Sequence, residues 1–86
     1  MDKAQIFEGI TGEMLELYKR KSHDYGDSTS DTYAKYGLVS YLVRMQDKIN
    51  RLSALLKSGA KVEESVEDTL IDLANYSVLA LMDVRK

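Results

Sequence analysis

The segment LVSYLVRMQDKINRLSALL, residues Leu38 to Leu56, decides the fold. Its apolar residues recur at alternating intervals of four and three, the spacing of a coiled-coil-like helical seam. The members of this seam are Leu38, Leu42, Met45, Ile49, Leu52 and Leu56. We expect a helix from Thr32 or Lys35 to Lys57, with Gly59 suited to the position just past its end.

Apolar periodicity predicts one further helix on each side of this segment. Before it, a helix from Asp2 to Lys21 is indicated by Phe7, Ile10, Met14 and Leu17. After it, a helix from Val62 to Val84 is indicated by Val66, Leu70, Leu73, Ser77, Ala80 and Val84. The turn formers between Ser22 and Asp31 separate the first two helices. Gly37 could interrupt the start of the second, which would leave Asp31 to Tyr36 as a separate short turn.

The predicted fold is a single all-α domain, residues 1–86, with three main helices. The second and third helices are joined by a short connection and should form a long antiparallel hairpin, across which the first helix packs. Three helices give a thin core, and a domain of this size buries only about 60% of its unfolded surface. We therefore expect homo-oligomerisation to complete the bundle.

Composition narrows the range of partners. The net charge of −2 and the pI of about 5.3 disfavour nucleic acid, which requires a basic face. The sequence has no cysteine, no apolar run near the roughly 20 residues that span a bilayer, and no signal-peptide pattern. We expect a cytoplasmic protein without membrane contact.

The apolar run TLIDLANYSVLALM, Thr69 to Met82, contains two polar residues on one helical face, Asp72 and Asn75. Asp68 lies one turn before Asp72, and Glu64 one turn before that. A carboxylate in apolar surroundings needs a partner. One interpretation is that Asp72 pairs with a cation of the neighbouring helix and fixes the register of the hairpin. The other is that these residues line a ligand or metal site.

A stripe of cations, Arg44, Lys48 and Arg51, runs beside the apolar seam. Three cations on one helical face could hold phosphate oxygens. They could equally be solvated or serve as partners for Asp68 and Asp72. Both interpretations stay open at this point.

The segment from Lys21 to Gly26 is predicted to be a loop beside these helices. Lys21 could meet a phosphate, Tyr25 could stack on a base, and Gly26 permits a tight turn. Asp24 suits a turn or a helix cap. His23, the only histidine, is expected to be exposed and without a role. The pair Glu13-x-x-Glu16 on the first helix is likewise expected to be solvent-exposed.

These motifs together resemble a family of phages and bacteria, nucleotide modification associated domain 1, over roughly Tyr18 to Met82. The resemblance rests on Lys21-x-x-Asp24-Tyr25-Gly26, Arg44-x-x-Asp47-Lys48-x-x-Arg51-Leu52 and Asp68-x-x-x-Asp72-x-x-Asn75-Tyr76. It implies an all-α domain distantly similar to the MazG-type nucleotide pyrophosphatases, a phage context and a nucleotide ligand.

The MazG-type mechanism holds Mg²⁺ between E-x-x-E on one helix and E-x-x-D on the next. Glu64, Asp68 and Asp72 could replace the second set. At the positions where the E-x-x-E pair would be expected, this chain has Arg44, Asp47, Lys48 and Arg51. Cations there would repel Mg²⁺ but suit direct phosphate binding.

The first hypothesis is therefore a nucleotide-binding protein without catalysis or cofactor. It would sequester a nucleotide, such as a cyclic or ADP-ribose-type signal of host antiviral defence, in the bacterial cytoplasm. The alternative is a Mg²⁺-dependent nucleotide pyrophosphatase, and a third hypothesis is a structural module that binds a protein partner through its seam. A site at a subunit interface is expected, with ligand contacts from Lys21, Asp24, Tyr25, Gly26, Arg44, Lys48, Arg51, Asp68, Asp72, Asn75 and Tyr76.

Overall fold

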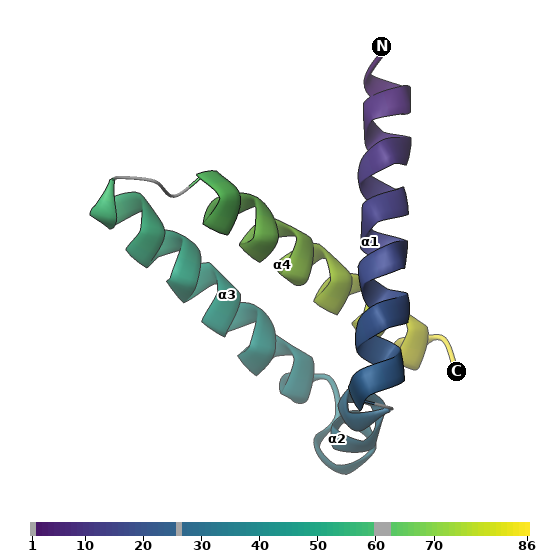
Figure 1. Ribbon diagram of the computed structural model, residues 1–86. Coiled ribbons are helices and arrows are strands. Elements are labelled where there is room, and N and C mark those ends of the chain that lie inside the picture. The colour runs from purple at the N-terminus through teal and green to yellow at the C-terminus, as the bar shows by residue number, and fades with distance from the viewer. Residues whose placement is uncertain (1, 26, 60–62) are drawn as a thin grey trace.

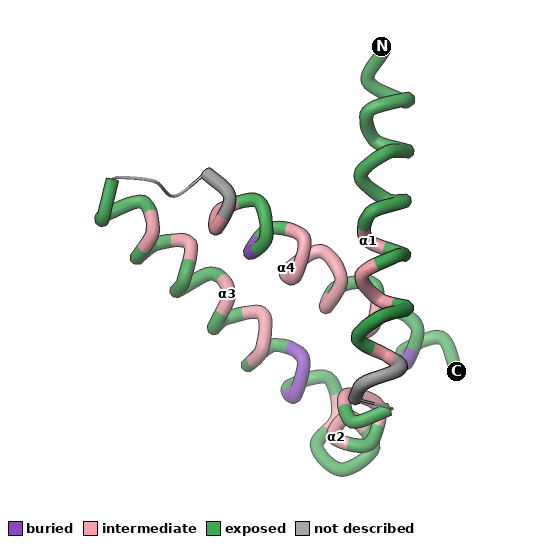
Figure 2. Tube along the Cα trace, viewed as in Figure 1, coloured by how far each residue is buried: buried purple, intermediate pink, exposed green. Residues whose placement is uncertain are grey.

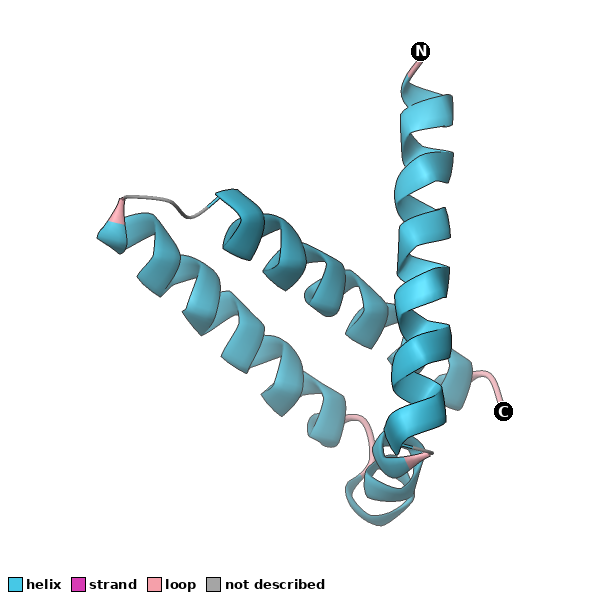
Figure 3. Cartoon of the chain, in the orientation of Figure 1, coloured by secondary structure: helices cyan, strands magenta, loops and turns pink. Residues whose placement is uncertain are grey.

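The computed structural model describes residues 2–25, 27–59 and 63–86, without the side chains of residues 23–25, 63 and 64. These residues form four helices (Figures 1 and 3): α1 (Lys3–Tyr25), α2 (Ser28–Tyr36), α3 (Val39–Ser58) and α4 (Glu63–Val84). No strand occurs in the described ranges, so the predicted all-α class is confirmed. None of the helices described is long and apolar enough to cross a membrane.

The first helix is longer than predicted. At its start, the Gln5 amide donates to the Asp2 carboxylate over 2.9 Å, and the Asp2 amide donates to the Gln5 side chain over 3.0 Å. This reciprocal pair is a capping box. At its end, α1 continues to Tyr25, so the prediction of a loop over residues 21–25 is wrong. Neither glycine nor proline occurs between Leu17 and Tyr25, and nothing in that stretch stops the helix.

The predicted second helix is divided in two at Gly37. This glycine has φ 73° and ψ −161°, a backbone region that essentially only glycine adopts, and its N–H donates to the Tyr33 carbonyl over 2.7 Å. The interruption at Gly37 that the sequence left open therefore occurs, but residues 31–36 belong to the nine-residue helix α2 rather than to a turn. Gly59 follows α3 as predicted, with φ 78° and its N–H donating to the Leu55 carbonyl.

Helix α3 makes the two most extensive helix–helix contacts in the fold: it packs along α4 and against α2. Figure 1 shows α3 and α4 side by side and running in opposite directions, with α2 at one end of the pair. The rings of Tyr33 on α2 and Tyr41 on α3 lie 5.9 Å apart. Helix α1 crosses α4 with its C-terminal half, and its N-terminal half projects beyond α4.

The side of α3 that is buried differs from the predicted seam. Tyr41 is buried, and Met45, Lys48 and Leu52 are half-buried. Four members of the predicted seam are exposed instead, namely Leu38, Leu42, Ile49 and Leu56. The helix is rotated so that Lys48 takes a half-buried place, where its ammonium group meets a carboxylate of α4.

Few apolar side chains are buried, as Figure 2 shows. Among the described residues these are Tyr41, 1% exposed, and Ala80, 9% exposed. Ser40, Thr69 and Asp83 are buried polar residues. The Thr69 hydroxyl donates to the Ser65 carbonyl one turn earlier, which satisfies it within its own helix. The centre of the fold is therefore unusually polar.

Candidate functional site

A pocket of about 330 Å³ lies where the end of α1, the start of α2 and the C-terminal half of α4 converge. Its volume is within the range of small-molecule sites. The residues of one chain that line it come from all four helices, Asp27 and the C-terminal Lys86. The residues that carry its polar chemistry are Lys21, Asp27, Arg44, Asp72, Asp83 and Lys86, with Tyr18 and Tyr76 as aromatic walls.

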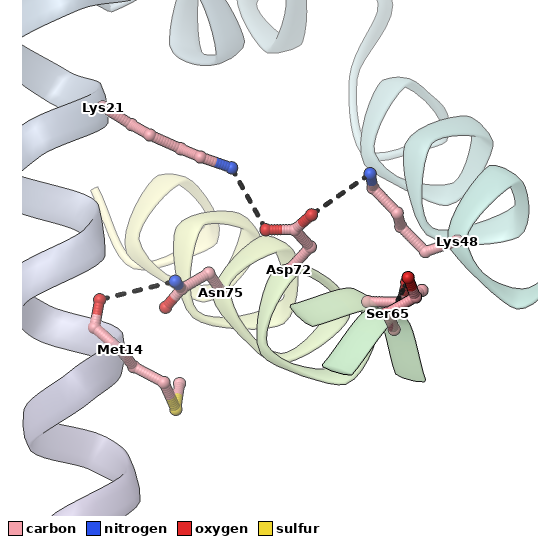
Figure 4. Close-up of polar contacts among 7 residues, drawn as sticks. Met14, Lys21, Lys48, Ser65, Asp72 and Asn75 are labelled. Carbon is pink, nitrogen blue, oxygen red and sulfur yellow. Dashed lines mark hydrogen bonds and ion pairs between the residues drawn. The ribbon is translucent and has the colours of Figure 1, made fainter. Parts of the chain in front are cut away.

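Asp72 forms the central polar junction of the fold, shown in Figure 4. One of its carboxylate oxygens lies 3.1 Å from the ammonium nitrogen of Lys21, and the other lies 3.2 Å from that of Lys48. The Asp72 side chain is only 21% exposed. It thus joins α1 and α3 to α4, and the interpretation that it pairs with a cation of the neighbouring helix is confirmed.

Asn75 also holds α1 to α4. Its side-chain amide donates to the backbone carbonyl of Met14 over 3.4 Å (Figure 4). Asn75 lies one turn beyond Asp72, so the two residues fasten α1 at neighbouring levels while both line the pocket. Their place on one face of α4 agrees with the sequence analysis.

Arg44 differs from the other cations of the pocket because it forms no ion pair within the described residues. It is half-buried on α3 and lines the pocket wall. The three cations of the predicted stripe therefore lie in three different surroundings. Arg44 reaches the pocket, Lys48 is engaged with Asp72, and Arg51 is exposed and lines neither of the cavities found.

The charges of the lining are largely paired. Asp72 is paired with two lysines, and Asp83 lies 3.1 Å from the ammonium nitrogen of Lys86. Asp27, just before α2, makes no ion pair or side-chain hydrogen bond with the described residues. One guanidinium and one carboxylate thus remain for a ligand. Such a pair suits a molecule that carries both an anionic group and hydrogen-bond donors.

A buried polar cluster beside the pocket was not predicted from the sequence. The Tyr41 hydroxyl donates to the Asp83 carboxylate over 2.5 Å, and the Ser30 hydroxyl donates to the same carboxylate over 3.0 Å. Burial raises the pKa of Tyr41, and the hydrogen bond from Tyr41 lowers the pKa of Asp83. The one available signal was the position of Asp83 directly after an apolar run.

A second groove lies where α1 crosses α4, on the other side of Lys21 and Asp72. Four carboxylates and two cations from these helices line this groove, called the acidic groove below: Glu13, Glu16, Asp68 and Asp72, with Arg20 and Lys21. Glu13 and Glu16 are exposed as expected, yet they lie opposite the acids of α4, which our three-helix arrangement did not foresee. In the described part of the chain, no three carboxylate or imidazole groups converge closely enough to hold one metal ion.

Several predicted site residues cannot be placed. The side chains of His23, Asp24, Tyr25 and Glu64, together with Gly26, lie outside the described residues. Lys21 and Tyr76 both line the pocket, whereas Asp68 lines only the acidic groove. Tyr18, which was not among the predicted ligand contacts, also lines the pocket and is half-buried.

Comparison with known proteins gives one match. A family model described as nucleotide modification associated domain 1 matches residues 21–84, close to the range expected from the motifs. The match includes Asp27 and Arg44, the two charged groups of the pocket that have no ion-pair partner among the described residues. No curated protein and no solved structure matches the chain.

Proposed function

We propose, from the premise that this chain belongs to the nucleotide modification associated domain 1 family, that its pocket binds a nucleotide. The observation that carries the proposal is Arg44, a half-buried guanidinium that lines a 330 Å³ pocket without an ion-pair partner among the described residues. A guanidinium can make two parallel hydrogen bonds to phosphate oxygens. Within a partly enclosed pocket, these bonds are less weakened by water than on an open surface.

The other lining groups suit the remaining parts of a nucleotide. Lys21, whose side chain is 48% exposed, can turn towards a second phosphate oxygen while Lys48 keeps Asp72 paired. Tyr18 or Tyr76 offers an aromatic face to a base. The unpaired carboxylate of Asp27 can accept hydrogen bonds from ribose hydroxyls or a base amino group.

We further propose that the nucleotide is sequestered rather than hydrolysed. Direct phosphate binding by Arg44 and Lys21 requires no metal, and the pocket contains no group that we assign to catalysis. A small phage protein of this kind would withhold a signalling nucleotide, cyclic or of the ADP-ribose type, from host antiviral defence. Asp72 and Lys48 would act in positioning Lys21, whereas Arg51 and Asp68 would not touch the ligand.

Hydrolysis is the second candidate function, and the acidic groove favours it. Glu13 and Glu16 line this groove together with Asp68 and Asp72, although Arg20 and Lys21 line it too. Carboxylate oxygens are the ligands that Mg²⁺ prefers. Side-chain rotation would have to bring three of them together, because none of the described carboxylates is grouped in that way now.

One experiment separates the two candidates. The protein is incubated with linear and cyclic nucleotides and Mg²⁺, separated from free ligand and heat-denatured, and the released compound is identified. Release of intact nucleotide supports sequestration, whereas release of cleaved nucleotide contradicts it and supports the hydrolase. If no nucleotide binds or is cleaved, both proposals are wrong.

A pair of arginine variants tests the assigned pocket. Arg44→Met should abolish the rise in melting temperature that a bound nucleotide causes, which corresponds to about 2.7 kcal/mol at a ligand concentration of 100 Kd. Arg51→Met removes the same charge from an exposed position on the same helix and should leave the rise intact. Equal loss in both variants would show that the pocket is not the binding site.

A further inference from the structure

The solvent-accessible surface of this chain is larger than expected for a compact folded monomer of its mass. The accessible area is 6725 Å², whereas a folded monomer of 9.7 kDa is expected to expose about 5,100 Å². The radius of gyration is 14.3 Å, against about 12 Å for a compact domain of this length. The excess of about 1,600 Å² exceeds the roughly 800 Å² that each partner buries in a standard interface. The chain therefore carries enough uncovered surface for a stable dimer.

Part of this excess lies on the N-terminal half of α1. Ile6, Phe7 and Ile10 are 49%, 70% and 46% exposed and recur along one helical face. In Figure 2 this half of α1 is exposed throughout and extends away from the other helices. An amphipathic helix of this kind gains little stability in isolation, because most helical stability comes from packing of the apolar face.

A second uncovered stripe lies on α3. Leu42, Ile49 and Leu56 are spaced by seven residues and are 55%, 45% and 73% exposed. The side of α3 buried within the chain, with Tyr41 and Leu52, is a different one. A heptad spacing of large aliphatic residues is the pattern that packs against another helix. Helix α3 already packs against α4 and α2, and this stripe remains exposed beside those contacts, where it can receive a further helix.

The N-terminal portion of α1 and helix α3, which carry the two stripes, have net charges of opposite sign. The portion of α1 up to Leu17 carries Glu8, Glu13 and Glu16 against a single lysine, Lys3. Helix α3 carries an excess of cations, which are Arg44, Lys48, Arg51 and Lys57 against Asp47. Arg44 lines the pocket and Lys48 is paired with Asp72, so neither belongs to the stripe. The opposite net charges still favour contact of α3 with this portion of α1 over contact of α3 with a second α3.

We infer that a second copy of this chain covers both stripes, with α1 of each copy packed along the Leu42/Ile49/Leu56 stripe of the other. The contact is reciprocal, so a two-fold axis closes the dimer and leaves neither stripe exposed. This inference is independent of the proposed nucleotide binding, and its test requires no ligand.

The first test is the mass in solution, measured by sedimentation equilibrium at micromolar concentrations. The wild-type chain should have twice the mass of 9.7 kDa. Leu42→Glu should give the mass of one chain. Val43→Glu is the matched control, because Val43 is 59% exposed but lies about 100° further round the helix, and it should remain a dimer. A monomeric wild-type chain, or identical masses for the two variants, overturns the inference.

Cysteine cross-linking keeps the inference testable if Leu42→Glu does not fold. The chain has no cysteine, so a Phe7→Cys protein can be mixed with proteins that carry cysteine at one stripe position each. After oxidation, a disulfide-linked heterodimer should form with Leu42→Cys, Ile49→Cys or Leu56→Cys. The matched controls, Val43→Cys, Asn50→Cys and Lys57→Cys, should not cross-link. Absence of cross-links, or equal yields with the controls, contradicts the proposed contact.

Discussion

Tyr41 on α3 donates its phenolic hydrogen to the Asp83 carboxylate on α4 over 2.5 Å, although the two residues are 42 positions apart in the sequence. Both are buried, with 1% and 6% of their surface exposed. The hydrogen bond connects the start of α3 with the end of α4, and Ser30 adds α2 to the same carboxylate. Three helices therefore meet at one buried charge.

Removal of the Tyr41 hydroxyl should destabilise the fold. Tyr41→Phe is expected to lower the free energy of unfolding by about 1–3 kcal/mol, because Asp83 loses a buried hydrogen bond to a charged acceptor. Urea denaturation followed by circular dichroism measures the change. Tyr36→Phe is the control, since Tyr36 is 67% exposed, and it should have almost no effect. Comparable losses in the two variants would show that the Tyr41–Asp83 bond does not stabilise the fold.

The same pair predicts how stability depends on pH. The pKa of Asp83 is lowered in the fold, so its contribution is present above the unfolded pKa of about 3.9 and is lost as pH falls through the folded value. The pKa of Tyr41 is raised, so its contribution is present below about pH 10 and is lost above that. Stability should therefore be greatest between these limits.

Asp83→Asn tests the acidic limit, because it removes the titrating group. Its free energy of unfolding should vary less between pH 5 and pH 2.5 than that of the wild type. Asp31→Asn, on the exposed side of α2, is the control and should retain the wild-type dependence. If Asp83→Asn loses stability in acid as steeply as the wild type, another group governs acid unfolding.

The sequence predicted the helical class because the apolar spacing is local and nearly continuous. It predicted three main helices rather than four: an interruption at Gly37 was considered, but the segment before it was expected to be a short turn and is the helix α2. The helix ends near Lys21 were misplaced, since polar residues that favour turns are also tolerated in a solvated last turn. The capping roles of Asp2 and Gln5 follow a local pattern but were not recognised.

The candidate site was predicted less completely than the fold. Asp72 was recognised because a carboxylate within an apolar run needs a partner, and Lys48 is such a partner. The separation of Arg44 from Arg51 was not predicted, because it depends on how α3 is rotated against α4. Tyr41 and Asp83 were missed for the same reason, since neither residue stands out until the two helices are packed.

The two ion pairs of Asp72 should contribute unequally to the stability of the fold. Lys48→Met should lower the free energy of unfolding by about 1 kcal/mol, and Lys21→Met by less than about 0.5 kcal/mol, because exposed ion pairs are weak. The Lys48 and Lys21 side chains are 27% and 48% exposed. Lys57→Met, an exposed site on the same helix, should have no measurable effect. An effect of Lys21→Met larger than that of Lys48→Met would contradict this assignment.

Glycine substitutions should have opposite effects at Gly37 and Gly9. Gly37→Ala places a side chain at φ 73° and ψ −161° and should lower the free energy of unfolding by about 1–3 kcal/mol, although its Cβ would meet no atom within 4 Å. The cost arises from the backbone alone, so repacking of neighbours cannot relieve it. Gly9 lies within α1 in open space, and Gly9→Ala should raise stability by about 0.5–1 kcal/mol. Thermal unfolding of both variants at one protein concentration measures these changes. A tolerated Gly37→Ala would contradict the backbone cost that we assign to this position, and would fit a change of the Gly37 backbone towards helical geometry.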